Sequence, residues 1–121
     1  MRSPFGPRWP AAERQRREGA VYRGEVPASF SREMGYTRRE FLANLETAMK
    51  GTEYHVREDG NVRIPLDAGY VDIRLGPDGN RVIASLALPR LEVDFRFTGV
   101  DAATRRDFYE AFQRSFQKGG G

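Results

Sequence analysis

The chain has 121 residues, which corresponds to about one domain. It contains no cysteine and a single histidine, His55, which excludes disulfides, iron–sulfur clusters and zinc sites built on several thiolates or imidazoles. The sequence has no apolar run long enough to span a bilayer and no secretory-signal pattern. We therefore expect a cytoplasmic protein with a modest core, no cofactor and no bound metal.

The net charge of +3 is concentrated near the N-terminus. Residues 1–35 carry seven arginines and four glutamates, whereas the remainder has 13 basic and 13 acidic residues. Prolines and glycines interrupt every periodic pattern there, so we predict a disordered basic tail over 1–35 and a single α+β domain over 36–121. Arginines and aromatic rings in this tail are candidate contacts for a protein partner or, less favoured, for nucleic acid. The candidate contacts are Arg8, Trp9, Arg14, Arg16 and Arg17.

The first helix is predicted from a capping box. In the run TRRE, Thr37 and Glu40 can each accept a hydrogen bond from the other's backbone amide. Apolar residues follow at helical spacing, and Gly51 suits a left-handed cap, which predicts a helix over 38–50. Residues 37–42 also resemble the core of the twin-arginine export motif. An export signal requires an apolar segment next, whereas the following residues are amphipathic, so we favour the capping box.

Alternating segments between residues 54 and 97 predict an antiparallel meander. Side-chain parity favours a three-residue loop at 58–60 that pairs Val56 with Val62, and an even-length loop at 67–70. Glycine, proline and aspartate predict a turn at 76–80.

A fourth strand is predicted over 81–88. It is apolar on nearly both faces, which is typical of a central or covered strand. The next strand, 91–97, is expected to pair with it by matching Leu88 to Leu91.

The last helix is predicted to begin after Asp101 and to carry a stripe of Phe108, Phe112 and Phe116. The stripe is wide enough to suggest a subunit interface. The expected fold is α+β, an antiparallel meander of four to five strands flanked by an N-terminal and a C-terminal amphipathic helix on one face.

Parity places charged residues on the sheet face away from the helices, where they could bind an anionic ligand or a complementary protein. A solvated sheet with cross-strand ion pairs is the alternative. The candidate binding residues are His55, Arg57, Arg63, Asp72, Arg74, Arg81, Asp94 and Arg96.

The chain ends in three glycines. A terminal Gly120–Gly121 pair resembles the exposed diglycine of ubiquitin-like carriers and modifiers. This resemblance implies attachment chemistry at the C-terminus.

No residue set converges on a reaction, since the usual bases and nucleophiles are nearly absent. We therefore expect a non-catalytic protein-interaction or adaptor module, an accessory subunit whose partner is another protein or a second copy. A carrier that uses Gly120 and Gly121, and a nucleic-acid binder that uses the tail, are the alternatives.

Overall fold

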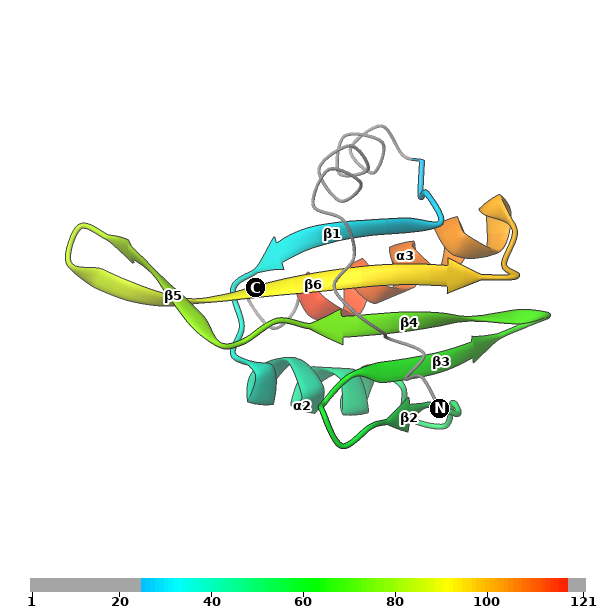
Figure 1. The fold of residues 1–121 in the computed structure, drawn as a ribbon, viewed down its shortest axis with the longest axis horizontal. Coiled ribbons are helices and arrows are strands. Elements are labelled where there is room, and N and C mark those ends of the chain that lie inside the picture. Colours follow the sequence, from blue (N-terminus) through cyan, green and yellow to red (C-terminus); the bar gives the residue numbers. More distant parts are fainter. Residues whose placement is uncertain (1–24, 118–121) are drawn as a thin grey trace.

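The computed structural model describes residues 25–117 (Figure 1). They form an antiparallel sheet flanked by two helices, which confirms the predicted α+β fold. The strands are β1 (Ser29–Met34), β2 (His55–Val56), β3 (Val62–Leu66), β4 (Gly69–Leu75), β5 (Gly79–Ile83) and β6 (Leu86–Thr98). The helices are α2 (Arg38–Ala48) and α3 (Ala102–Gln117). The strand order is β1-β6-β4-β3-β2, and β5 pairs with the end of β6 that projects beyond the other strands.

The core lies between the helices and the sheet face that both of them cover. Phe95, on the central strand β6, is completely buried and stacks on Phe30 of β1 with 4.8 Å between ring centroids. Two rings of α3, Phe112 and Tyr109, meet Phe95 edge-on at 5.1 and 5.6 Å. The aromatic stripe of the last helix therefore supplies much of the core.

Helix α2 begins at the predicted capping box. The Thr37 hydroxyl accepts from the Glu40 backbone N–H at 3.1 Å, and the Glu40 carboxylate accepts from the Thr37 N–H at 2.9 Å. The helix ends at Ala48, two residues before the predicted end, because Met49 caps it and leaves helical geometry. Gly51 then takes a left-handed φ of 82°.

The connection between β2 and β3 matches the prediction. Val56 pairs with Val62, and Gly60 takes a left-handed φ of 85° in the loop 58–60. The hairpin is closed by two backbone hydrogen bonds, in which the Arg57 N–H donates to the Asn61 carbonyl and the Gly60 N–H donates to the Arg57 carbonyl.

The connection between β3 and β4 has the predicted even length but is shorter. Leu66 pairs with Gly69, so the loop is a two-residue turn at Asp67 and Ala68 and not the four residues 67–70. Asp67 takes a φ of 46°, a left-handed conformation that aspartate tolerates better than most residues. Side chains stay on their predicted faces because the parity is unchanged.

Strand β1 lies inside the segment predicted to be a disordered tail, so the predicted boundary at residue 35 is too late. β1 pairs with β6 along its whole length, and Val26, Phe30 and Met34 are buried in the core. The inward position between Phe30 and Met34 is Arg32, whose guanidinium donates to the Tyr109 hydroxyl at 2.8 Å. This charged residue interrupts the apolar alternation from which a strand is predicted.

Helix α3 begins after Asp101, whose carboxylate accepts from the Thr104 backbone N–H at 2.8 Å. Hydrogen bonds from the Thr104 backbone and side chain hold the pKa of Asp101 below its ordinary value of 3.8. A carboxylate of this kind stabilises the fold above its unfolded-state pKa, and the contribution is lost as the pH falls through its folded-state pKa.

Asp101→Asn keeps a capping acceptor but removes the titration. We expect the stability of this variant to depend less on pH than that of the wild type below about pH 4. Urea unfolding at neutral pH and at several points below pH 4 measures the difference. Parallel loss of stability in the two proteins would contradict it.

Candidate interaction surface

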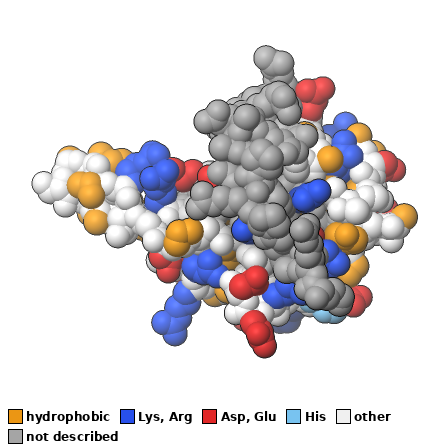
Figure 2. Space-filling model, in the orientation of Figure 1, with side chains coloured by type: hydrophobic (Ala, Val, Ile, Leu, Met, Phe, Trp, Pro, Cys, Tyr) orange, Lys and Arg blue, Asp and Glu red, His pale blue; other side chains and the backbone are white. Residues whose placement is uncertain are grey.

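The clearest exposed feature is a β-hairpin that we call the arm, residues 79–90, formed by β5 and the first five residues of β6 (Figure 1). Five large hydrophobic side chains are exposed among the described residues, and four of them lie on the arm. They are Val82 (71% exposed), Ile83 (52%), Leu86 (59%) and Leu88 (38%). Figure 2 shows hydrophobic side chains along this projecting part of the molecule.

The arm continues the hairpin of β4 and β6 past a bulge. Leu75 pairs with Val93 and Gly79 pairs with Arg90, so three residues, 76–78, lie opposite two on β6. One extra residue of this kind is a β-bulge, which bends a strand and redirects its side chains. The segment predicted as the turn 76–80 is thus a bulge followed by the start of β5, and the chain does not reverse there.

The chain reverses at Ala84 and Ser85, where φ is 49° and 74°. The predicted strand 81–88 is therefore wrong, because these residues form the two sides of a turn and Ile83 pairs with Leu86. The predicted match of Leu88 with Leu91 is wrong for the same reason. Turns with two left-handed residues usually contain Asn or Gly, and this one contains neither.

Both faces and both edges of the arm are accessible. The register places Ile83, Leu86 and Leu88 on one face, and Val82 with Ala87 on the other. Within the described residues, β5 pairs only with β6, and the pairing of β6 with β1 begins at Leu91. A two-stranded ribbon with apolar side chains on both faces has little intrinsic stability in water.

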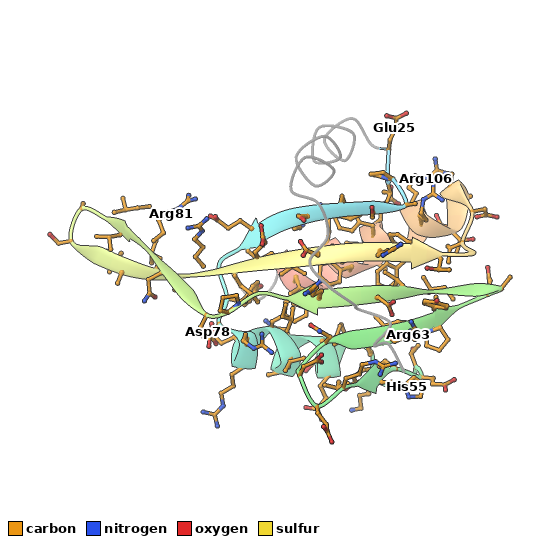
Figure 3. All side chains as sticks on the ribbon, viewed as in Figure 1. Glu25, His55, Arg63, Asp78, Arg81 and Arg106 are labelled. Atoms are coloured by element: carbon orange, nitrogen blue, oxygen red, sulfur yellow. The ribbon has the colours of Figure 1, made fainter. Side chains whose placement is uncertain are left out.

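The base of the arm is held to β1 by Glu33. Its two carboxylate oxygens pair with Arg81 and Arg90, each at 2.5 Å. Figure 3 shows Arg81 on the arm, whereas Arg63 and His55 lie on β3 and β2, toward the opposite edge of the sheet. Glu33 thus offsets one of the two positive charges of the arm, and residues 82–89 contain no charged side chain.

The other side of the base is held by α2. Arg38 donates to the carbonyls of Leu75 and Gly76 at 3.0 and 2.9 Å, and its backbone N–H donates to the Asp78 carboxylate at 2.7 Å. The Asp78 carboxylate also lies at the N-terminus of α2, where the positive end of the helix dipole stabilises a negative charge. The arm therefore projects in a defined direction.

The predicted charged face of the sheet is present as a ladder of paired strands. Across the sheet, Ser29, Arg96, Asp72 and Arg63 lie opposite one another on β1, β6, β4 and β3, and His55 on β2 continues the row. A second row joins Ser31, Asp94 and Arg74. Opposite charges thus alternate between neighbouring strands, an arrangement that stabilises a sheet.

Arg63 in the first row forms an ion pair with its neighbour on the next strand. Its guanidinium donates to both Asp72 carboxylate oxygens at 2.7 and 3.0 Å and lies 3.8 Å from the centroid of the Tyr70 ring. The hydrogen bond to Asp72 is the main reason that the pKa of Arg63 is raised. Ser31 donates to Asp94 in the second row.

The remaining predicted binding residues lie apart or are already engaged. Arg81 belongs to the arm, and His55 pairs with Glu53 at 3.1 Å in an exposed position. Arg57, Arg74 and Arg96 each have an interaction partner. Ligand binding by this face stays a prediction.

The predicted tail contacts, Arg8 to Arg17, and the C-terminal Gly120 and Gly121 lie outside the described residues. Within residues 25–117, no three His, Asp or Glu side chains are close enough to hold a metal ion. Neither described helix is long and apolar enough to cross a membrane.

A second apolar feature is a groove between α2, α3 and β3. It has a volume of about 220 Å³ and is lined by ten residues, none of them charged. Ile64, Met49 and Phe108 form part of its walls, with Ala111 on α3. Ile64 and Phe108 thus lie on the same side of the sheet, as the parity argument requires. Phe108, the partly buried ring of the aromatic stripe on α3, therefore lines this groove.

No protein-family model, curated protein or solved structure matches the chain. Sequence reasoning missed the aliphatic residues of the arm, although the signal was present: the run from Val82 to Leu88 is apolar on both faces and uncharged.

Proposed function

We propose that the chain is a non-catalytic protein-interaction module whose contact surface is the arm. The observation that supports this most is the concentration of exposed aliphatic side chains on one projecting hairpin. Contiguous exposed apolar surface on a soluble protein is characteristic of an interaction site.

The backbone of the arm supports the same function. Unpaired strand edges offer N–H and C=O groups to a partner strand, and alternate side chains of an extended segment then provide specificity. The arm combines such edges with apolar side chains, and its base is held by Glu33 and Arg38. A held arm loses less conformational entropy on binding than a mobile loop does.

The test compares two variants in a pull-down from native extract. Ile83→Asp combined with Leu86→Asp places charge on the arm, whereas Val56→Asp places charge on another exposed valine, 50% exposed, on β2. We expect the arm variant to retain about a tenth or less of the wild-type complex, because a buried aliphatic side chain contributes about 1.5–3 kcal/mol. We expect the Val56→Asp protein to retain most of it.

Urea unfolding of both variants provides the control for folding. Equal capture of the same partner by the wild type and a folded arm variant would contradict the proposal. A wild-type chain that is monomeric and captures no partner would also contradict it.

A further inference from the structure

We propose that the arm binds an extended segment of another protein, which adds to the free edge of β5 as an antiparallel strand and places a carboxylate opposite Arg81. This inference rests on the proposed function and adds the mode of binding, the edge that is used and the chemistry of the partner. It follows from the hydrogen-bond directions in the arm, the position of Pro89 and the charges at the base.

The hydrogen-bond directions within the arm follow from its two-residue turn. Ile83 and Leu86 flank this turn and pair with each other, so they exchange the first two backbone hydrogen bonds of the hairpin. Bonded and non-bonded pairs alternate along an antiparallel ribbon, and the next pair is Val82 with Ala87. The backbone N–H and C=O groups of Val82 therefore face outward at the edge of β5, and those of Ala87 face outward at the edge of β6.

Pro89 makes the two edges unequal. It pairs with Asn80, two residues along the ribbon from the pair of Val82 and Ala87, so both Pro89 and Asn80 also occupy outward-facing positions. Proline has no backbone N–H, so the edge of β6 lacks the donor that a partner strand would need there. The edge of β5 has complete donor and acceptor groups at both Asn80 and Val82. A partner strand is therefore expected on β5.

The charges at the base of the arm favour an acidic partner. Glu33 shares its carboxylate between Arg81 and Arg90, whose side chains are 56% and 57% exposed. Two guanidiniums and one carboxylate leave one positive charge on this group. A carboxylate placed opposite Arg81 would compensate that charge, whereas a lysine at the same position would add to it.

An antiparallel strand along β5 has a defined residue pattern. Its successive residues lie opposite Ile83, Val82, Arg81 and Asn80, because the two strands run in opposite directions. β-Branched aliphatic residues suit the first two positions, an acidic residue the third and a polar residue the fourth. Such a strand covers part of the exposed Ile83 and Val82 side chains and so removes apolar surface from water.

The probe for this site is a synthetic dodecapeptide with central residues valine, valine, glutamate and threonine between glycine–serine ends. Fluorescence anisotropy with the full-length protein measures its dissociation constant. Val82→Pro removes the outward N–H of β5, and Ala87→Pro is the matched control on β6; neither substitution removes a hydrogen bond within the arm. We expect Val82→Pro to raise the dissociation constant about tenfold or more, and Ala87→Pro to change it less than about twofold.

A second peptide, with lysine in place of the glutamate, tests the charge. We expect it to bind the wild-type protein about five times more weakly than the first peptide, and Arg81→Gln to remove this preference. This comparison does not depend on the proline variants. Urea unfolding shows which variants are folded.

The outcomes separate this inference from the proposed function. Equal weakening by the two proline substitutions when both variants are folded, or equal binding of the two peptides to the wild type, would overturn the strand addition described here. Absence of peptide binding, together with arm-dependent capture of another protein, would overturn the extended segment and leave the arm as the contact surface. Self-association that Val82→Pro abolishes would show instead that a second copy supplies the strand. Absence of any arm-dependent binding would overturn both proposals.

Discussion

Replacing Phe95 with alanine is expected to lower the free energy of unfolding by about 3–5 kcal/mol. Phe95 is completely buried on β6, and its ring contacts Phe30, Tyr109 and Phe112, which come from the first described strand and the last helix. Removing the ring leaves a cavity where these elements meet. Small domains have a total stability of only about 5–15 kcal/mol, so the variant should be largely destabilised.

Phe108→Ala is the matched control, because it deletes the same ring at a partly buried position. We expect the control to lose less than half as much stability as Phe95→Ala. Equilibrium unfolding in urea, followed by circular dichroism, compares the two. Equal losses would show that Phe95 is not the centre of the core.

Gly69→Ala is expected to destabilise the fold by roughly 3 kcal/mol, the upper part of the range for overpacking. A Cβ atom at this position would lie 1.9 Å from the Thr98 carbonyl oxygen and 2.6 Å from the Gly99 carbonyl carbon. Both are backbone atoms, which cannot move aside as the end of a side chain can. The substitution would separate the start of β4 from the end of β6.

Gly79→Ala is the control for this substitution. Its Cβ would lie 3.4 Å from the Arg90 carbonyl oxygen, an ordinary contact, and Gly79 does not have a positive φ. We expect a result between no change and about 1 kcal/mol of stabilisation, since alanine restricts the unfolded chain. Thermal or urea unfolding that shows similar effects for both substitutions would contradict the close approach at Gly69.

The elements that the sequence predicts correctly have strong local signals. The capping box at Thr37 satisfies backbone groups by contacts within four residues, and the left-handed glycine at residue 60 determines the register of β2 and β3. The amphipathic stripe of α3 also lies where its 3.6-residue period places it, with Phe112 and Phe116 buried.

The errors arise where long-range contacts decide the structure. Arg32 occupies an inward position of β1 because Tyr109, 77 residues away, accepts its hydrogen bond. The turn at Ala84 and Ser85 lacks the residues typical of left-handed turns, so the hairpin appears in the sequence as one strand. The extra residue at the bulge, between Leu75 and Gly79, then changes the parity on which register predictions depend.

The candidate site was the least predictable part. Apolar residues on both faces of residues 81–88 predict a strand covered by the rest of the domain, whereas the structure places them outside it. The expectation of a central or covered strand is therefore wrong for the described residues.

The arm and the centre of the core share a single strand. β6 runs without a break from Leu86 at the tip, past Arg90 at the base, to Phe95 in the core between the sheet and α3. Any tension applied at the tip passes along the covalent backbone and its ladder of hydrogen bonds directly into the best-packed residues of the molecule. A force on the arm is therefore transmitted to the core through β6, so the rigidity of the core limits how far the arm can move.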